Sequence, residues 1–237
     1  PFEVPADVYA DWNAGERGAA LESSWDAVMA GYRKAHPDLA AEFYEEATSV
    51  EGWVAHFWRG EFLSSQTRYE EALRCYREAL QTAPEAVRPN ILMRQADCAL
   101  AARLPEVALQ ASDELLDAPT FGSLGSLYRG RALYQQGRFE EALKAFEVGA
   151  GANPSGLALH FGRAHSLIML GRDPGPAYEE IFSLSPAFLQ PYLELARYRA
   201  STGREEEALQ VVGRARQYRS EADVLKEIEA QIRSGEI

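Results

Sequence analysis

The sequence predicts an all-α protein, built as a solenoid of about five helical hairpins with an N-terminal helical arm and a C-terminal capping helix. Internal repetition is the first observation behind this prediction. Residues 68–80 and 138–150 align almost residue for residue, and 203–215 is a third copy. The second observation is a set of alanines at intervals of 36, 34, 35 and 31 residues: Ala72, Ala108, Ala142, Ala177 and Ala208. Periods of roughly 20–50 residues are typical of stacked repeats, which bury the apolar faces of their neighbours.

Each repeat is expected to hold two helices. Before each alanine lies a further helical pattern with a small residue at its middle: Gly60, Ala96, Gly130, Gly162 and Ala196. Proline can end a helix but cannot continue it, and prolines close the first four repeats: Pro84, Pro119, Pro154 and Pro186. The predicted repeats are 53–86, 87–121, 122–155, 156–188 and 189–219.

Two repeats depart from the pattern. Pro105 lies near the start of a second helix, where proline is tolerated. In the fourth repeat, residues 172–177 replace the usual acidic start, so we expect its register to shift by two or three residues.

The two ends of the chain are predicted separately. Residues 1–50 do not follow the period and indicate an extended arm, a helix near 17–35 and another from Pro37. Residues 220–237 begin with the capping pattern Ser-Glu-Ala-Asp and continue with a helix that is apolar on one face. Its other face carries Glu221, Glu227 and Glu229, which favours a solvated cap over a membrane-surface helix.

Residues 53–219 resemble the tetratricopeptide repeat family, on the period, the small residues, the alanines and the closing prolines quoted above. The resemblance implies a right-handed α-solenoid whose first helices line a concave groove. It also implies that the residue after each small one points into this groove. Read along the repeats, that residue is Glu61, Asp97, Arg131, Arg163 and Arg197.

Residues 1–47 are similar to the segment that joins the first two domains of bacterial transketolases. The similarity rests on residues 1–12, Ser24-Trp25 and residues 31–43, and it ends near Phe43. Transketolase chemistry requires thiamine diphosphate, a divalent metal and a Gly-Asp-Gly motif, which this sequence lacks. A natural fusion, a constructed fusion and a chance helical similarity each account for the segment. As an N-terminal cap it would dock Trp25, Tyr32 and Phe43 on the first repeat.

Charge is distributed unevenly along the 237 residues, whose net charge is −12. Residues 1–50 hold 3 basic and 10 acidic side chains, whereas residues 122–219 hold 12 and 10. The overall acidity argues against a nucleic-acid partner, and no apolar run approaches the ~18 residues of a membrane span. Two cysteines favour a reducing compartment, so the predicted location is the cytoplasm.

The sequence predicts no catalytic, metal or cofactor site. None of the four histidines makes the i,i+4 pair with a glutamate that zinc hydrolases place on one helix face. Neither Cys75 nor Cys98 has a Cys or His close to it in sequence. The glutamates that open the second helices are expected to interact favourably with the positive end of the helix dipole.

A peptide-binding groove is the predicted functional site. Arginine forks pair with carboxylates, and aromatic side chains are enriched at binding hot spots. The expected groove residues are Phe57, Glu61, Met93, Asp97, Tyr128, Arg131, Tyr134, His160, Arg163 and Arg197. The N-terminal part of the groove is expected to be more apolar, with Phe57, Trp58, Met93 and Leu100.

The leading hypothesis is a non-enzymatic scaffold or adaptor that binds an acidic, or mixed apolar and acidic, peptide segment of another protein. One alternative is an accessory or fused module of a thiamine-dependent, transketolase-like enzyme. Another is a repeat scaffold that self-assembles into homo-oligomers.

Overall fold

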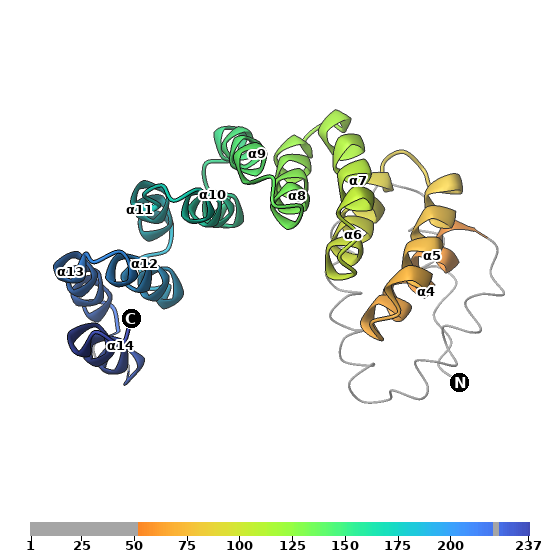
Figure 1. The fold of residues 1–237 in the computed structure, drawn as a ribbon. Helices are drawn as coiled ribbons and strands as arrows, with labels where there is room; N and C mark the ends of the chain where they lie inside the picture. The colour runs from red at the N-terminus through yellow and green to blue at the C-terminus, as the bar shows by residue number, and fades with distance from the viewer. Residues whose placement is uncertain (1–51, 220–222) are drawn as a thin grey trace. The chain divides into compact units, whose positions relative to one another are not determined.

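The computed structural model describes residues 52–219 and 223–237, which form helices and turns without a strand in either range (Figure 1). The helices are α4 (Trp53–Ser65), α5 (Tyr69–Thr82), α6 (Arg88–Ala101), α7 (Pro105–Asp117), α8 (Gly122–Gln135), α9 (Phe139–Ala152), α10 (Leu157–Met169), α11 (Gly175–Leu184), α12 (Leu189–Ser201), α13 (Glu205–Arg216) and α14 (Asp223–Ser234). The predicted all-α architecture of helical hairpins is confirmed. The predicted helices of the N-terminal arm, and its docking on the first repeat, lie outside the described residues.

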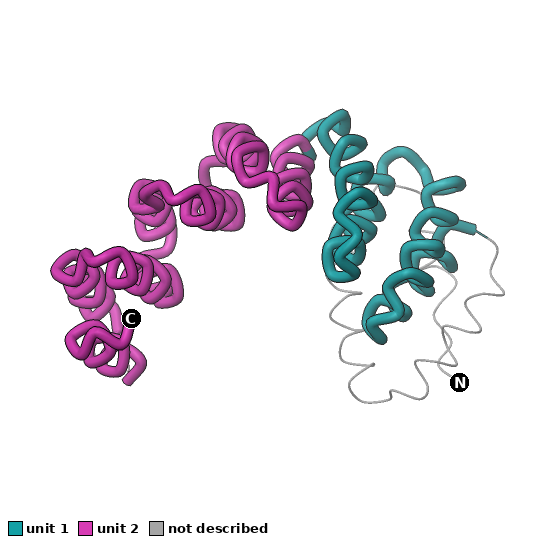
Figure 2. The backbone as a smooth tube through the Cα atoms, viewed as in Figure 1, with its two compact units in different colours: residues 1–121 teal, residues 122–237 magenta. Residues whose placement is uncertain are grey.

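The chain divides into two compact units, residues 1–121 (unit 1) and 122–237 (unit 2) (Figure 2). In unit 1, α4 packs on α5, α5 on α6 and α6 on α7. In unit 2 the same order of contacts runs from α8 to α14. We call α4, α6, α8, α10 and α12 the first helices, and α5, α7, α9, α11 and α13 the second helices. In the described ranges, no helix is both long and apolar enough to cross a bilayer.

The repeated alanines lie where helices meet. All five are fully buried, with no exposed surface: Ala72, Ala108, Ala142, Ala177 and Ala208. Each lies in a second helix, near its start. Because a larger side chain would separate the packed helices, a methyl group at this point lets the two backbones approach closely.

The small residues of the first helices make room for large rings. A Cβ atom on Gly60 would lie 2.7 Å from Cε1 of the buried Tyr76. The ring of Phe146 lies against two glycines, because a Cβ on Gly130 would lie 2.6 Å from its Cε1 and a Cβ on Gly162 closer still. Glycine lowers the helix propensity at these positions, but it leaves the space that the rings occupy.

The helix ends follow the predicted signals. Each of the four closing prolines is the second residue after the end of a second helix. Pro105 opens α7, where a missing N–H costs nothing. The fourth repeat differs most, because α11 begins only at Gly175 and is 10 residues long.

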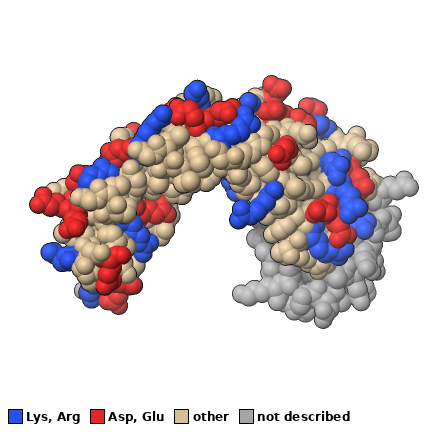
Figure 3. Space-filling view, viewed as in Figure 1, with Lys and Arg blue, Asp and Glu red and all other residues tan. Residues whose placement is uncertain are grey.

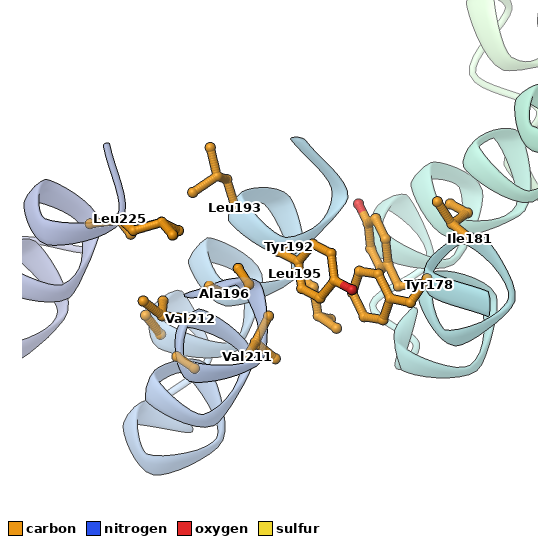
Figure 4. Close-up of a cluster of buried hydrophobic side chains, with 14 of the residues drawn as sticks. Tyr178, Ile181, Tyr192, Leu193, Leu195, Ala196, Val211, Val212 and Leu225 are labelled. Carbon is orange, nitrogen blue, oxygen red and sulfur yellow. The ribbon is translucent and has the colours of Figure 1, made fainter. Parts of the chain in front are cut away.

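The core of the C-terminal half runs from α10 to α14 (Figure 4). Tyr178, Leu195 and Leu225 are among its almost fully buried side chains. Burying a side chain of this size contributes about 1.5–3 kcal/mol. The outer face of α14 is polar, with Lys226 and Glu227 exposed, so α14 caps the hydrophobic core as predicted.

The turns inside the hairpins need a residue with a positive φ. Glycine fills this position in the last three hairpins, as Gly137, Gly171 and Gly203, whereas Thr67 (φ 62°) and Arg103 (φ 57°) fill it in the first two. A left-handed conformation costs an L-residue about 1–2 kcal/mol, and β-branched threonine tolerates it poorly.

We therefore expect Thr67→Gly to raise the free energy of unfolding by about 0.5–1 kcal/mol, after the larger unfolded-state entropy of glycine is deducted. Denaturant unfolding of the full chain measures it. The reciprocal variant Gly137→Thr should lower stability, and a loss of stability in Thr67→Gly would contradict the proposed strain.

Candidate peptide-binding surface

All ten predicted groove residues lie on first helices. The structure places Phe57 and Glu61 on α4, Met93 and Asp97 on α6, Tyr128, Arg131 and Tyr134 on α8, His160 and Arg163 on α10, and Arg197 on α12. The first four belong to unit 1 and the other six to unit 2. Each unit therefore presents its own part of the predicted surface.

Three of the ten side chains are buried and offer little surface to a partner. Phe57, Tyr128 and His160 are 5%, 4% and 4% exposed. Phe57 packs edge-on against the ring of Trp58, and its ring centroid lies 6.1 Å from that of Tyr76. The exposed members are Asp97, Arg131 and Arg197, and the remaining four are partly buried.

In unit 1, Glu61 and Asp97 meet at a pocket of about 330 Å³. The Tyr76 hydroxyl donates a hydrogen bond of 2.6 Å to Glu61 Oε1, and Arg94 Nε lies 3.8 Å from Glu61 Oε2. Burial, reinforced by the Glu61 charge, raises the pKa of Tyr76 well above its usual range, so the hydroxyl keeps its proton and orients the carboxylate. The lining residues are Glu61, Ser64, Ser65, Tyr69, Tyr76, Arg94, Asp97, Cys98 and Ala101.

This pocket is polar, whereas the sequence suggested an apolar surface in the N-terminal repeats. Trp58 and Leu100, which supported that expectation, are 6% and 4% exposed and belong to the core. The sequence reasoning also missed Arg94, although it lies on the same helix as Asp97, one turn earlier. The spacing of three residues could have predicted that these two charges lie on one face of the helix.

In unit 2, each predicted arginine has a different residue three positions earlier on its helix. The guanidinium of Arg131 lies over the ring of Tyr128, 5.7 Å from its centroid. Arg163 Nη1 lies 3.2 Å from His160 Nδ1. Residues three apart share a helix face, so Tyr128 and His160 support the arginines that follow them.

The corresponding residue before Arg197 is Glu194, whose carboxylate is already engaged. Glu194 Oε2 accepts hydrogen bonds from Tyr178 (2.9 Å) and His165 (3.1 Å), and its Oε1 accepts one from Gln190 (3.0 Å). These hydrogen bonds, that of His165 above all, lower the pKa of Glu194 to about 2, although burial acts in the opposite direction. No hydrogen bond or ion pair joins Arg197 to the described residues.

Charge is segregated between the two kinds of helix in unit 2. The first helices α8, α10 and α12 carry five arginines and one glutamate. The second helices α9, α11 and α13 carry eight glutamates and three cations. Both signs occur on the face shown in Figure 3, where many charges are interspersed.

Most arginines of unit 2 are neutralised by ion pairs. Carboxylates lie within 4.0 Å of seven of them, namely Arg138, Arg172, Arg199, Arg204, Arg214, Arg216 and Arg233. Within the described ranges, neither Arg163 nor Arg197 has such a partner. These two guanidinium groups therefore keep an uncompensated charge on the first helices.

The described residues hold no group of three or more His, Cys, Asp or Glu side chains placed for a metal ion. Cys75 and Cys98 are both buried thiols. Burial raises the pKa of both, that of Cys98 to about 11. Neither is therefore primed as a nucleophile.

Comparison with known families identifies two kinds of segment. Residues 53–86 and 126–175 match family models for the tetratricopeptide repeat, and residues 1–51 match the transketolase thiamine diphosphate binding domain. Both resemblances predicted from the sequence are confirmed.

Solved structures share the repeat fold. A crystal structure of MamA has a TM-score of 0.57 at 16% identity and covers 68% of this chain and 94% of its own. A thermophilic tetratricopeptide repeat protein of Thermus thermophilus has a TM-score of 0.55 at 22% identity, with coverages of 76% and 98%. A tetratricopeptide repeat protein of Parabacteroides merdae has a TM-score of 0.57 at 17% identity, with coverages of 95% and 89%. At these identities the likeness concerns the fold.

The transketolase likeness is high in identity but short. Transketolase 1 of Pasteurella multocida is 54% identical over 43 residues, which are 18% of this chain and 6% of that enzyme. Transketolase 2 of Xanthobacter flavus is 58% identical over 43 residues, with the same coverages. The chain thus spans only a small fraction of the length of these curated relatives, and the matching residues lie outside the described part of its own structure.

Proposed function

Since residues 53–86 and 126–175 match tetratricopeptide repeats, we propose that this protein is a non-enzymatic scaffold that binds an acidic segment of another protein on the first helices of unit 2. The observation that carries the proposal is the uncompensated charge of Arg163 and Arg197, in a unit where seven other arginines are paired with carboxylates. We place this function in the cytoplasm, where the two thiols would stay reduced.

The arginines suit an acidic rather than an apolar segment. A guanidinium presents a planar fork that binds carboxylates bidentately, and charge-assisted hydrogen bonds are about twice as strong as neutral ones. Arg131, Arg163 and Arg197 occupy the same position in three successive first helices. The mixed apolar and acidic segment has less support, because Phe57 and Tyr128 are buried.

The test is a charge reversal at all three arginines. With a capped deca-glutamate peptide as probe, we expect the variant Arg131→Glu, Arg163→Glu, Arg197→Glu to bind at least about tenfold more weakly at low salt, because each replaced fork becomes a repulsive carboxylate. Calorimetry with the full chain measures the affinity.

The control reverses three exposed cations that lie away from the first helices: Lys144→Glu, Arg219→Glu and Lys226→Glu. It changes the net charge by the same amount and should bind more tightly than the first variant. Equal affinities in the two variants would refute the proposed site and leave only a net-charge effect.

A second candidate function follows from the transketolase-like segment. An accessory module of a thiamine-dependent enzyme would use residues 1–47 to associate with that enzyme, and the identity of 54% and 58% over 43 residues favours it. It predicts co-purification with a transketolase-like protein that is lost when residues 1–47 are deleted. Retention by the deleted chain would exclude this role for the segment.

The self-assembly alternative has weaker support. End-to-end stacking requires an apolar terminal face, whereas the outer face of α14 carries exposed Lys226, Glu227 and Arg233. Light scattering over a range of concentrations distinguishes it, because a stacking scaffold would grow in mass.

A further inference from the structure

His160 is a buried polar side chain whose two ring nitrogens both have partners. Its Nε2 lies 2.8 Å from the carbonyl oxygen of Pro154, and its Nδ1 lies 3.2 Å from Arg163 Nη1. A carbonyl only accepts, so Nε2 carries the hydrogen and donates it. Nδ1 then offers its lone pair to the guanidinium N–H. The imidazole thus links a backbone carbonyl to an arginine.

From this geometry we propose that His160 is a positioning residue, which holds the guanidinium of Arg163 ready for a carboxylate of the bound segment. The proposal rests on the proposed function and adds a second residue to it. His160 itself is 4% exposed and would not touch the partner.

The chemistry of the imidazole distinguishes it from other possible supports. A carboxylate bonded to Arg163 would orient the guanidinium but would also neutralise it, as in the ion pairs Arg172–Glu140 and Arg214–Glu179. A neutral imidazole orients the guanidinium and leaves its charge available to an anion. Among the described residues, no carboxylate lies within 4.0 Å of Arg163.

A second observation indicates that Arg163 is held in place at a cost. Its Nε is buried, with no hydrogen-bond partner in the described part of the chain. A buried donor without an acceptor is unfavourable, so a free arginine side chain would be expected to extend into solvent instead. The hydrogen bond to His160 opposes this movement and fixes the direction of the fork.

A double-mutant cycle tests the proposal. With the capped deca-glutamate peptide and the full chain, we expect Arg163→Gln to weaken binding about tenfold and His160→Phe about three- to tenfold. Because His160 acts through Arg163, His160→Phe should have no further effect in the Arg163→Gln background. His56→Phe, the same change on a helix of unit 1, is the matched control and should not affect binding.

Two conservative variants keep the test independent of folding. Asparagine places its carbonyl oxygen near the position of Nδ1 and can still accept from Arg163, whereas glutamine places its amide near Nε2. We expect His160→Asn to retain most of the affinity and His160→Gln to lose it, with circular dichroism confirming that both variants are folded.

The outcomes separate this inference from the proposed function. If Arg163→Gln leaves binding unchanged, the proposed function fails at this arginine. If Arg163→Gln weakens binding but His160→Phe does not, or does so equally in both backgrounds, only the positioning role is overturned. Equal binding by the Asn and Gln variants would also overturn it.

Discussion

Gly162→Ala is expected to lower the free energy of unfolding by about 2–3 kcal/mol, although alanine is the better helix former. The added Cβ would overlap the ring of Phe146, which is 2% exposed. The ring has little room to move, because the same edge also lies against Gly130, where a Cβ would lie 2.6 Å from Cε1. Overpacking of a closed core is therefore expected to exceed the gain in helix propensity.

Chemical denaturation of the full chain measures the effect, and Gly213→Ala supplies a matched control in the same unit. A Cβ on Gly213 meets nothing within 4 Å, so this substitution should raise stability by up to about 1 kcal/mol. Adding Phe146→Leu to Gly162→Ala should restore part of the loss, since a smaller side chain vacates the space. If Gly162→Ala is as stable as Gly213→Ala, the ring does not constrain the packing of α8, α9 and α10.

Much of the fold was predictable because the same packing residues recur in successive repeats of the sequence. The period identified the repeated alanines, from Ala72 to Ala208, and all five are fully buried in the structure. The closing prolines placed the ends of second helices, because proline cannot continue a helix. At these positions the residue type and the periodicity predict the same packing, and the structure confirms it.

The turns were less predictable. In the third to fifth hairpins glycine marks the left-handed position, but Thr67 and Arg103 occupy it in the first two. No side-chain signal reveals a positive φ at threonine, since the conformation is imposed by the two helices that the turn joins. Alignment of the repeats on Gly137 could have found it.

The exposure of the predicted groove residues followed from the sequence in part. The position after each small residue correctly selected exposed Asp97, Arg131 and Arg197. The sequence could not separate surface from core for Phe57 and His160, because their burial depends on contacts between helices that are distant in sequence. The acceptor role of His160 likewise needs the hydrogen-bond geometry of its ring, which sequence spacing does not contain.

Glu194 was not singled out from the sequence, yet its carboxylate joins three helices of unit 2. Tyr178 on α11 and His165 on α10 both donate to its Oε2, at 2.9 and 3.1 Å. A carboxylate only accepts, so His165 carries its hydrogen on Nε2. The burial that raises the pKa of Tyr178 also keeps this hydroxyl protonated as a donor. The network therefore favours the ionised form of Glu194 in the folded state.

Acid is consequently expected to destabilise the protein through this group. The pKa of Glu194 falls from 4.5 to about 2 on folding, which corresponds to about 3 kcal/mol of stability, and its side chain is 24% exposed. This contribution is complete above about pH 5 and is lost as the pH falls through the folded pKa, because protonation is easier in the unfolded chain.

Glu194→Gln should lower the free energy of unfolding by about 3 kcal/mol at pH 7. It should also flatten the pH dependence of this free energy between about pH 5 and 2, as measured by urea unfolding at a series of pH values. The exposed Glu180, changed to glutamine, should leave both quantities within about 0.5 kcal/mol of wild type. Parallel pH profiles for Glu194→Gln and wild type would show that the carboxylate is not ionised preferentially in the folded state.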